Sequence, residues 1–193
     1  MRASPTRYAP GMTEVAQRYA TVADAFGARI SGIAPDGWHA PTPCSEWTAR
    51  DLVAHVIGTQ RRMIATLDGT EPAEVDPGDD LPRLWRAASD AVADALTDEH
   101  RAATVVSGMF GEQPFESLVG RLACADTLIH TWDLARATGQ DERLDPYAVA
   151  KAMEFLAPID EGMRRPGGFT AKIEPPADAD EQTKLLNFCG RAA

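Results

Sequence analysis

Three side chains with metal-binding chemistry occupy stripes that an amphipathic helix would normally fill with apolar residues. His55 stands on one stripe, and Asp126 and His130 stand on another, four residues apart and so on one helix face. The apolar neighbours are Leu52, Val53 and Val56 on the first stripe and Leu122, Ala123 and Ile129 on the second. A carboxylate on an apolar stripe is costly unless it is paired or bound to a metal. Two imidazoles and a carboxylate converging from two helices predict a divalent-metal site with coordination positions left open for water or substrate.

The same residues have interpretations that need no metal. His55 alone fits a hydrogen-bonded core histidine, and Asp126 with His130 fits a helical ion pair worth a few tenths of a kcal/mol. Asp133 follows His130 by three residues and is either an acceptor that orients an imidazole or a surface charge near the helix end, and we expect the surface charge. Cys44 precedes the first helix of the pair, and we expect it to be structurally buried and not reactive.

Other recognisable chemistry is missing from the sequence. There is no glycine-rich phosphate loop, no GxSxG and no HExxH. This excludes nucleotide hydrolysis, the α/β-hydrolases and the common zinc peptidases. His39 and His100 stand in connections rich in polar or turn residues, and we do not expect either to be a ligand.

Composition and charge limit the partners and the compartment. The 193 residues carry a formal net charge of −10, which argues against nucleic acid and against anionic membrane surfaces as partners. Three widely spaced cysteines without a CxxC motif indicate free thiols in a reducing compartment. Residues 1–7 are followed by no apolar signal-peptide segment, and no apolar run approaches the ~20 residues of a membrane span. We therefore expect a cytoplasmic protein.

Helical periodicity dominates the chain. Apolar residues recur at steps of three and four. The predicted helices span residues 12–33, 48–67, 81–96, 115–137, 146–156 and 180–188. Thr48 is placed to cap the second of these with Asp51 completing a capping box, and Gly69 and Gly139 are placed to end the second and the fourth.

The connections contain little that could form a sheet. Residues 69–80 form an acidic loop rich in Pro and Gly, and residues 101–115 predict an extended segment or a small hairpin. Four long helices without strand–helix alternation predict an all-α bundle. We expect one domain over 1–193, with its core at about 11–140 and a C-terminal extension over 141–193 that ends in a short helix.

Three segments resemble one known family. Residues 41–55 (PTPCSEWTARDLVAH) and 125–140 (ADTLIHTWDLARATGQ) resemble the second and fourth helices of the DinB-like superfamily, and 185–191 (LLNFCGR) is similar to the end of its small members. The nearest branch is named for the N-terminal domain of mycothiol-dependent maleylpyruvate isomerase. The resemblance implies an up-down four-helix bundle with a metal at one end of its core, held by His55, Asp126 and His130. Asp126 stands where the isomerase has a glutamate.

The resemblance also implies a function. Related bundles include thiol-dependent S-transferases, so we expect a metal-dependent, thiol-using isomerase or S-transferase of the mycothiol type, acting on a small electrophile. Zinc is the expected ion, with nickel, iron and manganese as alternatives that suit the same ligands. Alternative interpretations are a non-catalytic protein that binds metal or a small ligand, a metal-dependent hydrolase using a bound hydroxide, and a metal-free bundle in which Asp126 pairs with a histidine. The sequence leaves the oligomeric state open, with pairing of two copies through a helix face as one alternative.

Overall fold

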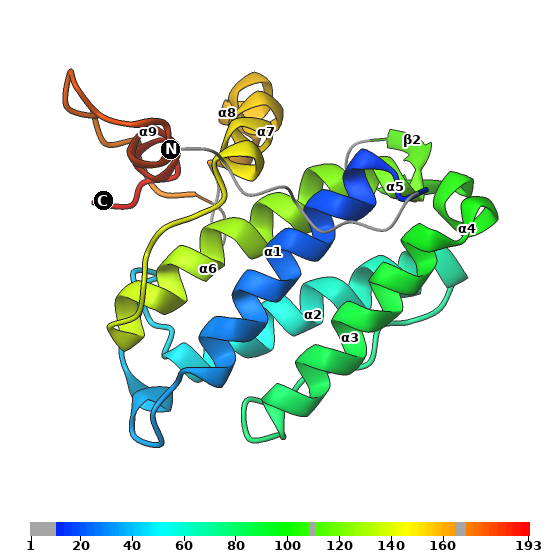
Figure 1. Cartoon of the computed structure of the whole chain (residues 1–193), viewed down its shortest axis with the longest axis horizontal. Coiled ribbons are helices and arrows are strands. Elements are labelled where there is room, and N and C mark those ends of the chain that lie inside the picture. Colours follow the sequence, from blue (N-terminus) through cyan, green and yellow to red (C-terminus); the bar gives the residue numbers. More distant parts are fainter. Residues whose placement is uncertain (1–10, 109–110, 165–168) are drawn as a thin grey trace.

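Four long helices form the body of the protein (Figure 1). The computed structural model describes residues 11–108, 111–164 and 169–193. The long helices are α1 (Glu14–Ser31), α2 (Ala49–Asp68), α3 (Leu81–Thr97) and α6 (Cys124–Thr138). The all-α, DinB-like fold class expected from the sequence is confirmed. Among the described residues, no helix is both long enough and apolar enough to cross a membrane.

The helices pack in a ring in which α1 and α2 each contact both α3 and α6. The loop after α2 runs back along that helix, because Arg61 donates to the carbonyl of Glu74 and Arg50 donates to that of Pro77. At the other end, Arg101 just beyond α3 pairs with Asp68 at the end of α2, at 2.9 Å. Thus α2 and α3 run parallel, whereas the expected up-down order would have made them antiparallel.

Local signals place the helix ends close to where the sequence predicts them. Thr48 and Asp51 form a reciprocal capping box at the start of α2. Gly69 and Gly139 follow α2 and α6 with φ of 65° and 67°, a left-handed conformation that glycine adopts at little cost. The predicted capping roles of these four residues are confirmed.

The helix predicted over 115–137 is continuous but not uniform. It begins as α5 (Phe115–Leu118), passes through a π-helical turn, η2 (Val119–Ala123), and continues as α6. In a π-helical turn the hydrogen bond joins residues five positions apart, and not four as in an α-helix, which changes the helix face that the following residues present. The face that carries Asp126 therefore begins directly after this turn.

A small antiparallel hairpin precedes this helix. It was one of the two structures expected for residues 101–115, the other being an extended segment. Strand β1 (Val105–Gly108) pairs with β2 (Gly111–Pro114), and Val106 lies opposite Gln113. The hairpin residues Met109 and Phe110 lie outside the described residues. His100, which we expected in a connection, belongs to the short helix α4 (Glu99–Ala103).

A chain of hydrogen-bonded polar side chains crosses the largely apolar core of the bundle. Phe26 and Trp85 meet edge to face between α1 and α3, with ring centroids 4.8 Å apart. The Tyr19 hydroxyl donates to Gln60 at 2.9 Å, and the Gln60 amide donates to Thr127 at 3.1 Å. These buried hydrogen bonds join α1, α2 and α6, and set the position of α2 relative to α6 close to the candidate site.

The C-terminal extension folds against α6. In chain order its elements are α7 (Pro146–Leu156), the 3-10 helix η3 (Ala157–Ile159), α8 (Asp160–Met163) and α9 (Glu181–Phe188). Another 3-10 helix, η1 (Gly37–His39), lies before α2. Helix α7 packs on α6 and α9 packs on α7. Leu185 and Leu186 of α9 are fully buried in the same apolar cluster as the bundle core. Residues 166–168, a predicted break, lie outside the described residues.

Candidate metal centre

Two packed helices bring the three predicted ligands together. His55 lies on α2, in the second turn after the Thr48 cap, and Asp126 and His130 lie one turn apart on α6. The His55 and His130 rings meet edge to face with centroids 5.1 Å apart. The convergence predicted from the two helical stripes is therefore present in the structure.

The connection before α2 covers one side of this group. Pro41 and Thr48 form an isolated antiparallel bridge, and between them Glu46 has a φ of 72°, a left-handed conformation that is unusual for a residue with a side chain. This tight loop brings the Trp47 ring to 4.6 Å from the His55 ring and 6.1 Å from the His130 ring, measured between centroids. Trp47 thus limits the movement of both imidazoles.

The distances in the group suit a small divalent ion. Oδ1 of Asp126 lies 3.4 Å from Nε2 of His55 and 3.6 Å from Nε2 of His130. Ligands held at about 2.1 Å by a tetrahedral ion lie about 3.4 Å from one another. Oδ2 of Asp126 is buried and makes no hydrogen bond of normal geometry within the described residues, although the Thr59 hydroxyl is near enough to help lower the pKa of the carboxyl. A buried carboxylate oxygen with an incomplete set of hydrogen bonds can serve as a metal ligand.

The electrostatics keep Asp126 ionised. Burial raises its pKa, but the charge of His130 and the hydrogen bond with His55 outweigh burial, so the pKa lies below the usual value. A carboxylate that stays charged while mostly buried is a suitable ligand for a hard or borderline cation.

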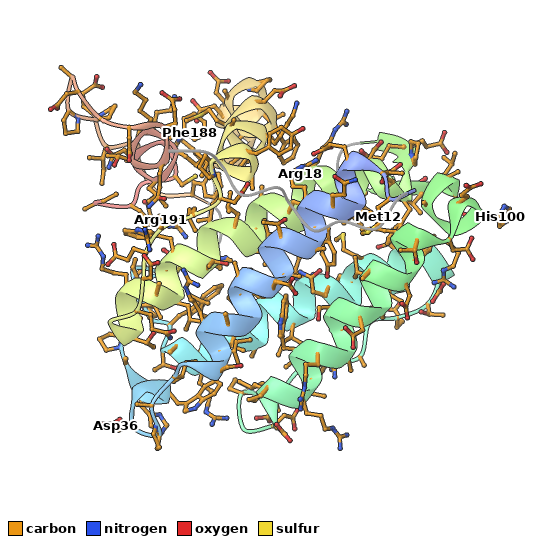
Figure 2. All side chains as sticks on the ribbon, viewed as in Figure 1. Met12, Arg18, Asp36, His100, Phe188 and Arg191 are labelled. Carbon is orange, nitrogen blue, oxygen red and sulfur yellow. The ribbon has the colours of Figure 1, made fainter. Side chains whose placement is uncertain are left out.

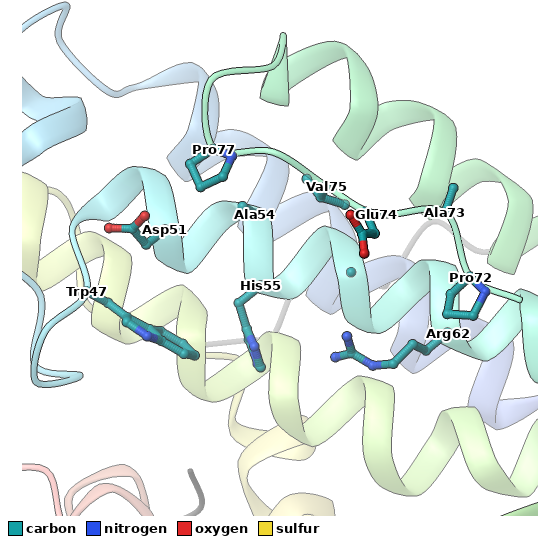
Figure 3. A pocket seen from close by; sticks show the side chains of 11 residues that line it. Trp47, Asp51, Ala54, His55, Arg62, Pro72, Ala73, Glu74, Val75 and Pro77 are labelled. Carbon is teal, nitrogen blue, oxygen red and sulfur yellow. The ribbon is translucent and has the colours of Figure 1, made fainter.

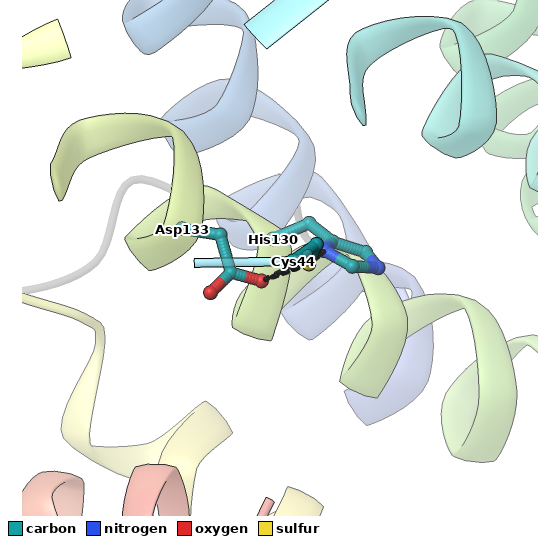
Figure 4. A group of neighbouring side chains, drawn as sticks. All are labelled: Cys44, His130 and Asp133. Carbon is teal, nitrogen blue, oxygen red and sulfur yellow. Dashed lines mark hydrogen bonds and ion pairs between the residues drawn. The ribbon is translucent and has the colours of Figure 1, made fainter. Parts of the chain in front are cut away.

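Behind His130 lies a second group that sequence reasoning assigned wrongly. Asp133 is completely buried, and its Oδ2 lies 2.9 Å from Nδ1 of His130 (Figure 4). The expectation that Asp133 is a surface charge is therefore wrong, because its helix face turns inward under the C-terminal extension. Cys44 donates to the same oxygen at 3.4 Å. Its thiol is only partly buried, so the expectation of a buried, purely structural cysteine is not confirmed.

Arg191 completes this second group from the far end of the chain. Its Nη2 lies 2.9 Å from Oδ2 of Asp133 and 3.3 Å from Sγ of Cys44. Burial raises the pKa of Asp133, but hydrogen bonds from His130 and Arg191 lower it to about 2. The spacing of three residues between His130 and Asp133 indicated their contact. Nothing in the local sequence around Asp133 indicates Arg191 as its second partner.

Among the residues that the structure describes, two sets of side chains could hold a metal ion, and they share His130: the set His55, Asp126 and His130, and the set Cys44, His130 and Asp133. The second set already has a cation, since the Arg191 guanidinium contacts both Asp133 and Cys44. A divalent ion there would be repelled by that fixed charge at short range. The first set has an unpartnered carboxylate oxygen and is the better candidate. His39 and His100 belong to neither set.

A pocket opens on the exposed side of His55. It measures about 440 Å³ and is bounded by α2 and by the loop between α2 and α3. Figure 3 shows Trp47, His55 and Arg62 in a row beneath the loop residues Glu74 and Pro77. A molecule in this pocket would meet an aromatic wall at one end, a guanidinium at the other and the His55 imidazole between them.

Comparison with known proteins supports the family resemblance. A family model described as Mycothiol maleylpyruvate isomerase N-terminal domain matches residues 19–135. The chain belongs to this family. Two uncharacterized proteins of Mycobacterium tuberculosis, from strains CDC 1551 / Oshkosh and ATCC 25618 / H37Rv, are each 33% identical over 188 residues, which covers 87% of this chain and 92% of each relative. No solved structure matches the chain significantly.

The part of the chain matched by the isomerase N-terminal-domain family contains both candidate ligand sets. His55, Asp126 and His130 lie inside residues 19–135, and so do Cys44 and Asp133. Arg191 lies outside the matched part. The cation that neutralises Asp133 is therefore supplied by the C-terminal extension and not by the matched domain.

Replacing Cys44 with serine is expected to leave the metal content unchanged. If His55, Asp126 and His130 hold the ion, the cobalt(II)-loaded wild-type protein should lack the intense near-ultraviolet band of thiolate-to-cobalt charge transfer, because these ligands are imidazole and carboxylate. Absorption spectra of both proteins measure this directly. A strong band that disappears in Cys44→Ser would instead place the ion in the Cys44, His130 and Asp133 set.

Proposed function

We propose that this chain binds one divalent metal ion, of the zinc type, through His55, Asp126 and His130, and catalyses a thiol-dependent isomerisation or S-transfer on a small electrophile. The observation that carries the proposal is the Asp126 carboxylate, which lies between two imidazole nitrogens at 3.4 and 3.6 Å with its other oxygen unpartnered. The membership of the isomerase N-terminal-domain family supports a mycothiol-type thiol as the cosubstrate.

Such an ion, when bound, lowers the pKa of a thiol or a water toward neutrality and so supplies a nucleophile. The protein side chains hold and orient the reactants. His55 joins the ligand set to the 440 Å³ pocket, so a molecule in the pocket is placed directly beside the ligand set. Trp47 lies beside both imidazoles and forms one side of the pocket.

The test is turnover by the purified protein with and without metal. Mycothiol, glutathione and cysteine are each combined with maleylpyruvate or with an aromatic chloride, and the loss of thiol and the change of electrophile are followed separately. We expect turnover that needs both thiol and metal and that a chelator abolishes. His100→Ala serves as the control variant, because His100 lies on α4 at the edge of the molecule (Figure 2), whereas the ligand set lies on α2 and α6.

Each other outcome identifies a different alternative. A protein that holds metal but turns over no electrophile with any thiol is a binding protein without catalysis. Ester cleavage that needs metal but no thiol indicates a hydrolase. A wild-type protein that holds no metal leaves the metal-free bundle, in which Asp126 is paired with the two histidines.

The metal-free protein is expected to lose stability as the pH rises from 6.5 to 10. Burial lowers the pKa of His130, but the charge of Asp126 and the hydrogen bond with Asp133 raise it to about 10. A folded-state pKa above the unfolded value gives stabilisation that is complete below pH 6.5 and is lost as the pH rises through 10. Urea unfolding of chelator-treated protein across this range measures the loss.

Added zinc should change the sign of this dependence. A metal binds the neutral imidazole and competes with the proton, so zinc stabilises the protein more at pH 8 than at pH 6. His130→Gln should show neither the fall in chelator nor the gain with zinc. A metal-free stability that is flat from pH 6.5 to 10 would contradict the raised pKa of His130.

A further inference from the structure

The C-terminal Arg191 makes a two-point contact with a buried carboxylate behind the candidate metal centre. Its Nε donates to Oδ1 of Asp133 at 3.2 Å, and its Nη2 donates to Oδ2 at 2.9 Å. The two side chains are 10% and 0% exposed. A paired guanidinium–carboxylate contact fixes orientation as well as charge, because both carboxylate oxygens are held in one plane.

The end of the chain is built to hold this arginine in place. The Arg191 backbone N–H donates to the carbonyl of Leu186 at 2.8 Å, and the Asn187 amide donates to the Arg191 carbonyl at 2.8 Å. Its Nη1 also donates to the carbonyl of Cys189 at 2.9 Å. Gly190 has a φ of 80°, and a side chain there would collide with Thr170. The turn after α9 therefore directs Arg191 toward α6 (Figure 2).

Asp133 passes this constraint to a predicted ligand. Its Oδ2 accepts from both Arg191 and Nδ1 of His130, each at 2.9 Å. A histidine that donates through Nδ1 presents Nε2 as its free ligand atom, and Nε2 of His130 is the atom that faces Asp126. Through Asp133, the contact with Arg191 therefore helps to orient the His130 ring and its ligand atom Nε2.

We propose that Arg191 is a positioning residue for the metal centre, which holds the Asp133 carboxylate in the orientation that aims Nε2 of His130 at the ion. This inference rests on the proposed function, since it needs an ion held by His130. It extends the centre beyond the part of the chain matched by the family, which ends at residue 135. The C-terminal extension then serves the metal centre as well as the packing of the bundle.

The test measures zinc affinity by competition with a chelating dye, in wild type, Arg191→Gln, Arg191→Lys and Arg164→Gln. Arg164 is the matched control, because it also ties down the C-terminal segment, donating to the Phe188 carbonyl at 2.7 Å and pairing with Asp160. We expect Arg191→Gln to bind zinc about 10- to 100-fold more weakly. Arg191→Lys should lose less zinc affinity, since an ammonium keeps the positive charge but cannot make the two-point contact with the carboxylate. Arg164→Gln should bind as wild type does.

A spectroscopic readout separates positioning from loosened packing. The visible absorption of bound cobalt(II) reports ligand geometry, so it should shift in Arg191→Gln and stay unchanged in Arg164→Gln. Wild-type zinc affinity in a folded Arg191→Gln overturns the inference and leaves the proposed function standing, and an equal loss in Arg164→Gln also overturns it. If Arg191→Gln does not fold, Arg191→Lys decides, with wild-type affinity counting against the inference. A wild-type protein that binds no zinc overturns the proposed function itself.

Discussion

The double variant His55→Ala, Asp126→Ala is expected to hold no metal, whereas the wild-type protein, purified without added metal, should hold about one ion per chain. The variant removes two of the three ligands and leaves His130, which cannot retain a divalent ion alone. Elemental analysis of both proteins gives the metal content directly. A chelator should lower the melting temperature of the wild type and leave that of the double variant unchanged, because only a folded protein with a site gains stability from the ion.

The control for this variant is His100→Ala, Asp90→Ala, which removes the same two residue types from exposed positions on α4 and α3. It should keep the wild-type metal content. Equal metal in the wild type and in the ligand variant would contradict the site. No metal in either protein, with identical melting, would indicate that the polar residues of this region satisfy one another.

Asp133→Ala is expected to lower the free energy of unfolding by about 3 to 5 kcal/mol, because it leaves a buried charge without its partner. Asp133 is completely buried and holds both Arg191 and His130 at 2.9 Å. Without it, the remaining partners of the Arg191 guanidinium among the described residues are the Cys44 thiol, the Cys189 carbonyl and the Phe169 ring. Urea unfolding measures the change, with chelator present so that metal binding does not contribute.

An exposed ion pair provides the comparison for this loss. Asp141 pairs with Arg143 at 2.8 Å, but both side chains are exposed, so Asp141→Ala should cause no measurable change in stability. Asp133→Asn keeps the shape of the side chain and removes its charge, and it should be nearly as destabilising as Asp133→Ala. A loss below about 1 kcal/mol in Asp133→Ala would contradict the view that this carboxylate anchors the C-terminal extension.

The periodicity of the chain was enough to predict the bundle and the three-residue group on it. His55, Asp126 and His130 could be identified because each breaks an apolar stripe, and a stripe is a local property of one helix. The caps at Thr48, Gly69 and Gly139 were equally predictable, since a cap depends on residues within one turn. The parallel direction of α2 and α3 was not predictable, because it depends on where the loop over 69–80 lies along α2.

The sequence by itself therefore determined the helices, their ends and the candidate ligands, because each follows from interactions between residues a few positions apart. Only the tertiary structure decided the roles of Asp133 and Arg191. The two residues are 58 positions apart. Their pairing depends on how the C-terminal extension covers α6, and no local pattern encodes that. The same packing turned Asp133 from an expected surface charge into a buried partner of His130 and placed a cation beside Cys44 in the competing ligand set.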